Sequence, residues 1–182
     1  MNRLVDVLVS LFIFILFLPV FVIILLLGYF DTGAPVFKQT RVGKYQQPFV
    51  LLKFRTMDVA TKSVASHLAN TASITKLGAF LRKSKLDELP QLLNVLKGDM
   101  SLVGPRPNLY NQEELIQERA QRHVYDVKPG ITGLAQINNI DMSTPKLLAE
   151  TDAKMVSEFS FKNYIRFLLL TFIGKGKGDA VK

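Results

Sequence analysis

The chain has 182 residues, a formal net charge of +8 and no cysteine. That length is sufficient for one domain with its own hydrophobic core. The lack of cysteine excludes a disulfide framework and thiolate-bound zinc, and the basic excess indicates an anionic partner.

Residues 1–30 form an apolar N-terminal segment. Between Asp6 and Asp31 lie 24 residues without a charge, enough for a helix to cross a bilayer. Pro19 removes a backbone hydrogen bond near the middle of this run and predicts a kink. The residues favour neither of two geometries: a kinked helix that spans the membrane, or a re-entrant helix that enters one leaflet and returns. A cleaved signal peptide is disfavoured, because no small-x-small pattern follows the segment.

The basic excess gathers in residues 32–57, which contain no acidic side chain. Directly after an apolar segment, such a cluster favours the anionic cytoplasmic leaflet of a membrane. Nucleic acid is the other natural partner of basic charge, but no helix-turn-helix, zinc or aromatic-platform signature accompanies the cluster. We therefore expect membrane lipids as a partner and no nucleic acid. The basic residues are Lys38, Arg41, Lys44, Lys53 and Arg55.

Residues 31–173 are predicted to form one α+β domain that is mostly helical. Residues 36–42 and 48–56 are short apolar or β-branched stretches and predict two strands or a hairpin. Thr75 is a candidate cap for a short helix.

Three further helices are predicted downstream. One runs from near Asp87 to Lys97, with Gly98 as its stop signal. A polar helix covers residues 109–122, and a last helical region begins near Pro145. The tail at 174–182 alternates glycine and lysine and is expected to be disordered.

An apolar stripe follows the predicted C-terminal helix at helical spacing. It suits packing in the core and an interfacial helix on a bilayer equally well, since a membrane-anchored domain needs a surface against the lipid. The stripe consists of Phe161, Tyr164, Ile165, Leu168, Leu169 and Phe172.

Asp87 and Glu88 are adjacent carboxylates in a basic stretch. Proline is tolerated in the first turn of a helix, so Pro90 predicts a helix that begins at or just before Asp87. The N–H groups and dipole at such a helix start would favour a carboxylate and bind phosphate. An ionised aspartate there can attack phosphorus to form an acyl-phosphate. The alternative is an ordinary N-cap residue.

Two features extend this candidate site. Asp87 and Glu88 together are the oxygen ligands that Mg²⁺ prefers when it also binds substrate phosphates. Arg106 lies between Pro105 and Pro107, which limit the backbone, and a fixed guanidinium suits a phosphate or the edge of a base.

The sequence resembles the catalytic core of the bacterial monotopic phosphoglycosyl transferases, the bacterial sugar transferase family. The match is closest over residues 74–107 (ITKLGAFLRKSKLDELPQLLNVLKGDMSLVGPRP) and continues in 52–57 and 128–136. The chain looks like a small, single-domain member. The resemblance implies a re-entrant N-terminal helix broken at Pro19, followed by a catalytic domain with amphipathic interfacial helices on the cytoplasmic face of the bacterial inner membrane.

The resemblance also implies a reaction. Such enzymes transfer a sugar-1-phosphate from a UDP-sugar to polyprenol phosphate, release UMP and start glycoconjugate assembly. The residue matching Asp87 is the nucleophile, and the one matching Glu88 supports Mg²⁺ and catalysis. Arg106, in the motif from Pro105 to Pro107, resembles a nucleotide contact.

Other matches are less specific. Lys53 and Arg82 resemble basic residues near the phosphate site. Many relatives have Asn-Gly-Arg where this chain has Asn138-Asn139-Ile140, so an arginine that the resemblance implies as a substrate contact has no counterpart here. An N-acetylated amino sugar is the expected donor; alternatives are glucose or galactose, or a membrane scaffold without activity. A homodimer is compatible with the sequence.

Overall fold

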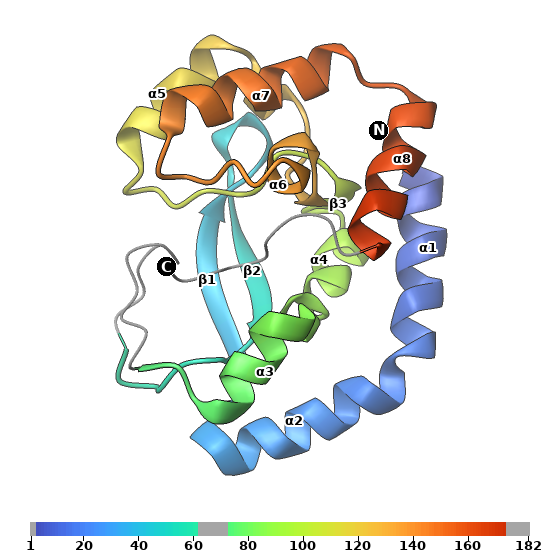
Figure 1. Ribbon diagram of the computed structural model, residues 1–182, viewed down its shortest axis with the longest axis vertical. Helices are drawn as coiled ribbons and strands as arrows, with labels where there is room; N and C mark the ends of the chain where they lie inside the picture. Colours follow the sequence, from blue (N-terminus) through green and yellow to red (C-terminus); the bar gives the residue numbers. More distant parts are fainter. Residues whose placement is uncertain (1–2, 62–72, 174–182) are drawn as a thin grey trace.

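The computed structural model describes residues 3–61 and 73–173. Figure 1 shows two N-terminal helices, one along the right side of the molecule and one along its bottom, with a β-hairpin near the centre and further helices around the hairpin. The arrangement is α+β and mostly helical, as predicted. The tail predicted to be disordered, 174–182, lies outside the described residues.

The apolar N-terminal segment forms two helices, α1 (Arg3–Leu16) and α2 (Leu18–Thr32), which meet at a bend of 63°. Pro19 lies in the first turn of α2, and the break falls at Phe17 because a proline ring clashes with the turn before it. The predicted kink is confirmed. Within the described residues no single helix is long and apolar enough to cross a membrane. The two helices of the bent pair, taken together, have a sufficient length and an apolar composition.

A buried carboxylate attaches α1 to the domain. Asp6 is 2% exposed and accepts hydrogen bonds from Ser101 Oγ at 2.8 Å, from the Leu102 amide at 2.9 Å and from Tyr164 Oη at 2.7 Å. Burial raises the pKa of the Tyr164 phenol, as does its bond to Asp6, so the phenol remains a donor. These bonds satisfy a charge that would otherwise be costly to bury.

The second helix of the bent pair also packs on the domain. Ile24, near the middle of α2, is buried in a cluster with Phe54 and Leu81. The helix ends at Gly33, whose φ of 72° is favourable only without a Cβ, and the chain enters the first strand three residues later, at Val36. Both helices of the pair therefore contact one domain.

The central hairpin consists of β1 (Val36–Val42) and β2 (Pro48–Phe54), which pair antiparallel with Val36 opposite Phe54. This confirms the predicted hairpin. A short 3₁₀ turn, η1 (Lys44–Gln46), joins the strands.

Two helices follow the hairpin. α3 (Lys76–Ser84) is capped by Thr75, whose Oγ1 accepts from the Gly78 amide at 2.9 Å, as predicted. After the 3₁₀ turn η4 (Leu86–Glu88), α4 (Gln91–Lys97) ends at Gly98, which has a φ of 102°.

Two short strands, β3 (Ser101–Val103) and β4 (Gly130–Thr132), pair in parallel. Their backbones come together at Gly104 and Gly130. A Cβ on Gly130 would lie 2.0 Å from the Gly104 nitrogen, so only glycine fits there.

The remaining elements surround one end of the hairpin and the side of α1 (Figure 1). The polar helix predicted over 109–122 is shorter, because the chain turns before it begins at Glu113. The elements are α5 (Glu113–Gln121), η5 (Val124–Asp126), α6 (Leu134–Ile137), α7 (Pro145–Ser157) and α8 (Phe161–Phe172).

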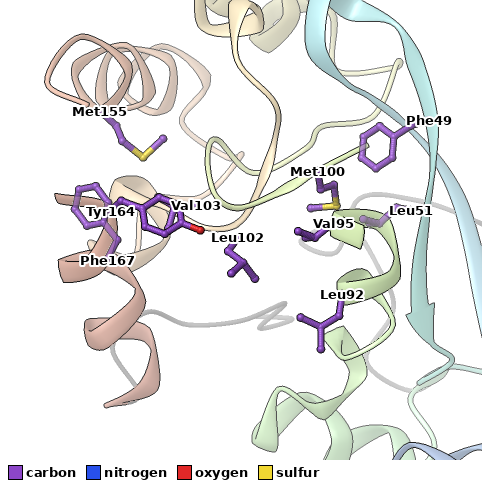
Figure 2. Close-up of a cluster of buried hydrophobic side chains, with 10 residues drawn as sticks. All are labelled: Phe49, Leu51, Leu92, Val95, Met100, Leu102, Val103, Met155, Tyr164 and Phe167. Carbon is purple, nitrogen blue, oxygen red and sulfur yellow. The ribbon is translucent and has the colours of Figure 1, made fainter. Parts of the chain in front are cut away.

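The main core joins the hairpin to the C-terminal helices. Figure 2 shows the side chains of the hairpin and α4 on one side and those of α7 and α8 on the other, with β3 between them. Partly buried residues of α1 pack against this cluster, so the apolar helix shares the core of the domain. The members are Phe49, Leu51, Leu92, Val95, Met100, Leu102, Val103, Met155, Tyr164 and Phe167.

The apolar stripe of α8 divides between the two predicted roles. Tyr164 of the stripe is fully buried, and Phe167 beside the stripe is 7% exposed, so this side belongs to the core. Phe161 and Leu169 are more than half exposed. The helix therefore packs on the domain by one edge and presents an apolar edge outward.

Candidate active site

Asp87 lies in η4, the 3₁₀ turn between α3 and α4. The prediction that the α-helix begins at Asp87 is wrong, because α4 begins only at Gln91. The intervening residues form hydrogen bonds to carbonyls three positions back in the chain. These run from the Glu88 amide to the Lys85 carbonyl and from the Leu89 amide to the Leu86 carbonyl, both at 3.2 Å. A 3₁₀ turn accommodates this connection, because Pro90 has no N–H to continue an α-helical ladder backward.

The Asp87 carboxylate is buried, with 4% of the residue exposed. Lys53 Nζ, near the end of β2, lies 4.0 Å from Asp87 Oδ2. A buried carboxylate needs a compensating charge, and the hairpin supplies it. The structure therefore places Asp87 where an anionic group can be held ionised away from bulk water.

Glu88 links two of the predicted cations. Its Oε1 accepts from Lys53 Nζ at 3.2 Å and from Arg106 at 2.9 Å. Lys53 thus lies against both carboxylates, and Arg106 reaches Glu88 from the turn after β3. Three segments far apart in the sequence, β2, η4 and the turn after β3, meet here.

Arg82, on α3, is oriented by the end of the hairpin. Its Nε donates to Thr56 Oγ1 at 2.8 Å. The helix can approach this closely because Gly78 packs on the Thr56 backbone, where a Cβ would lie 2.0 Å from the carbonyl oxygen. Arg82 is therefore fixed beside the strand that carries Lys53.

The turn from Pro105 to Pro107 is anchored at its first residue. The Gly130 amide donates to the Pro105 carbonyl at 2.9 Å. A small recess lies beside the turn and is lined in part by Val42, Val124 and Tyr125. Burial raises the pKa of the Tyr125 phenol, which keeps it neutral and able to donate.

The sequence analysis did not identify a buried ion pair that lies behind this turn. Arg119 on α5 and Asp152 on α7 form an ion pair at 2.6 Å, with side chains 1% and 0% exposed. Burial raises the pKa of the Asp152 carboxyl, and the neighbouring Arg119 opposes that shift. Each residue is one of several charged side chains in its helix, so no local signal marks the pair as buried.

The fold and the site define a class of protein: an apolar bent helix pair joined to a domain in which a buried aspartate and a neighbouring glutamate meet Lys53 and Arg106. Comparison with known proteins gives the family. The bacterial sugar transferase family matches residues 1–176, and the chain belongs to this family.

Individual relatives cover the chain to different extents. An uncharacterized sugar transferase of Bacillus subtilis is 48% identical over 76% of this chain and 69% of its own length. The UDP-glucose:undecaprenyl-phosphate glucose-1-phosphate transferase of Escherichia coli is 39% identical over 94% of this chain, which spans only 39% of that longer protein. An exopolysaccharide production protein of Rhizobium leguminosarum is 37% identical, with 98% of each chain covered.

Proposed function

We propose that this protein transfers a sugar-1-phosphate from a UDP-sugar to undecaprenyl phosphate and releases UMP. The observation that supports this most directly is the buried Asp87 carboxylate, with Lys53 beside it and the Glu88–Arg106 contact next to it. The family and the names of the relatives supply the reaction class.

In the proposed reaction, Asp87 attacks the phosphorus that bears the sugar. A bond forms between a carboxylate oxygen and phosphorus, and the bond to the bridging oxygen breaks, so that oxygen and its electron pair leave with UMP. An oxygen of the lipid phosphate then attacks the same phosphorus and releases Asp87. The order of steps is ping-pong.

Lys53 and Arg106 reduce the repulsion between the carboxylate and the anionic diphosphate. Both are held by Glu88, at 3.2 and 2.9 Å, so they are in place before substrate arrives. Positive groups fixed in advance can also stabilise the charge that develops on the leaving UMP. The Arg106 side chain, which extends from this rigid turn, is the proposed contact for the nucleotide.

Asp87 and Glu88 fit Mg²⁺ as a cofactor. Within the described residues no group of three or more His, Cys, Asp or Glu side chains could enclose a metal ion. Mg²⁺ suits such an open set, because it is commonly bound by one or two carboxylates together with substrate phosphates. When bound, it would supply charge neutralisation at the phosphates.

A re-entrant membrane helix places this site at the lipid interface. Both helices of the bent pair contact the same domain, α1 through Asp6 near its start and α2 through Ile24 near its middle. Both α1 and α2 also expose large apolar side chains, among them Phe12 at 67% and Phe30 at 83%. Such a re-entrant helix pair would hold the domain against one leaflet, on the cytoplasmic side that the basic cluster favours. The site would then lie beside the phosphate of the lipid acceptor.

The donor sugar is the least determined part of the proposal. The N-acetylated amino sugar expected from the sequence stays a prediction. Two relatives are named for hexoses: a UDP-galactose-lipid carrier transferase of Erwinia amylovora and the Escherichia coli glucose-1-phosphate transferase. These names favour glucose or galactose as the first donors to test.

A UMP-release assay tests the function. Purified protein in nanodiscs with undecaprenyl phosphate and Mg²⁺ would be given UDP-glucose, UDP-galactose and their N-acetylated amino analogues in turn. We expect one donor to release UMP, and an excess of EDTA to abolish that release. Absence of UMP with every donor would contradict the transferase proposal, and release unchanged in EDTA would contradict the metal assignment alone.

Cysteine labelling tests the membrane geometry. The natural chain has no cysteine, so Leu4→Cys and Asp31→Cys each introduce one site, near opposite ends of the bent pair. A re-entrant helix predicts that a membrane-impermeant maleimide labels both from the face that also labels Ser143→Cys in the domain. Labelling of Leu4→Cys from the opposite face would show a spanning helix.

A further inference from the structure

The buried ion pair behind the Pro-Arg-Pro turn has no assigned role. Arg119 donates to Asp152 Oδ2 through Nε at 3.1 Å and through a terminal nitrogen at 2.6 Å. Replacing a buried ion pair with well-packed apolar residues is often neutral or stabilising, so stability alone explains this pair poorly. The other contacts of the guanidinium indicate what it does.

Arg119 holds the backbone at Arg106. Its second terminal nitrogen donates to the Arg106 carbonyl and to Asn108 Oδ1, each at 2.9 Å. Tyr125 Oη donates to the same Asn108 oxygen, also at 2.9 Å. One guanidinium therefore joins Asp152 on α7 to the two ends of the segment 106–108.

The rest of this segment is held from the hairpin. Arg41 donates to the Pro107 carbonyl at 3.1 Å, and the Val42 amide donates to the Asn108 carbonyl at 2.9 Å. Three consecutive carbonyls, from residues 106 to 108, are thus each bound by a different donor group. The side chain of Arg106 leaves this fixed backbone toward Glu88, which its guanidinium contacts at 2.9 Å.

We propose that Arg119 and Asp152 are positioning residues that set the place of the Arg106 guanidinium at the reacting phosphates. The inference rests on the proposed function. Asp152 Oδ2 accepts from two nitrogens of Arg119 and so orients the guanidinium. Arg119 then fixes the backbone carbonyl of Arg106, the residue whose side chain reaches the site. Lysine at position 119 could keep the charge pair with Asp152, but without the planar fork it could not hold Asp152, the Arg106 carbonyl and Asn108 together.

A double-mutant cycle tests the proposal. We would measure UMP release by wild type, Arg119→Lys, Arg106→Ala and the double variant. Because a displacement of about 1 Å at a reacting group can cost roughly 100-fold, Arg119→Lys is expected to lower the rate about 10- to 100-fold. In the Arg106→Ala background the same change is expected to lower it less than about 2-fold, because the group that it positions is absent.

Arg122→Lys is the matched control. Arg122 lies one turn from Arg119 and pairs with Glu118 and Glu150, away from the turn, so this change is expected to leave UMP release unaltered. If Arg119→Lys does not fold, Tyr125→Phe serves in the same cycle, because it removes only the hydroxyl bound to Asn108.

The possible results separate the two proposals. Equal losses in the wild-type and Arg106→Ala backgrounds would mean that Arg119 acts independently of Arg106 and would overturn the positioning role, while the transferase function stands. Wild-type protein without UMP release would overturn the transferase function and this inference with it. A loss confined to the background that contains Arg106 supports the proposal.

Discussion

The Asp87→Asn variant is expected to release UMP at least about 10³-fold more slowly than wild type, because removing a nucleophile closes the covalent route. Asparagine has almost the same shape, and the site is held by Lys53, Glu88 and Arg106, so the fold should persist. The rate of UMP release from the preferred donor measures this effect.

Intact-protein mass gives a second measurement of the same prediction. Wild type incubated with donor but without lipid acceptor should gain the mass of one sugar-phosphate group, and Asp87→Asn should gain nothing. Asp126→Asn is the control, because the Asp126 side chain is 58% exposed and is not part of the site. Undiminished UMP release in Asp87→Asn would refute the nucleophile assignment.

The Gly78→Ala variant is expected to have a free energy of unfolding about 3 kcal/mol lower than that of wild type. Overpacking of this kind forces the backbone to shift and is destabilising. The added Cβ would lie 2.0 Å from the Thr56 carbonyl oxygen and 2.6 Å from its carbon, and backbone cannot yield as a flexible side chain can. The gain in helix propensity, about 1 kcal/mol, is too small to offset this. Urea unfolding in detergent measures the change.

The same substitution should lower UMP release. Moving α3 away from the hairpin separates Arg82 from Thr56, which are joined at 2.8 Å. Lys83→Ala, at an exposed position of the same helix, should change the free energy of unfolding by no more than about 0.5 kcal/mol. A Gly78→Ala protein as stable as wild type would contradict the close packing of α3 on Thr56.

Much of the local structure could be predicted from sequence, because its causes are local. The Thr75 cap, the Gly98 stop and the kink before Pro19 follow from single residues whose backbone chemistry leaves few alternatives. The start of α4 could not be predicted, because Pro90 is compatible both with a first helical turn and with the 3₁₀ turn that the structure contains.

The sequence by itself determined the α+β class, the adjacent carboxylates and, through a resemblance, the family and its reaction. Only the tertiary structure decided how Lys53, Glu88 and Arg106 meet, and where Arg119 and Asp152 act. It also joined Asp6 to Tyr164, 158 residues away in the chain. The physical reason is that a buried charge is tolerable only beside specific partners, and residue patterns do not encode which distant segments the core brings together.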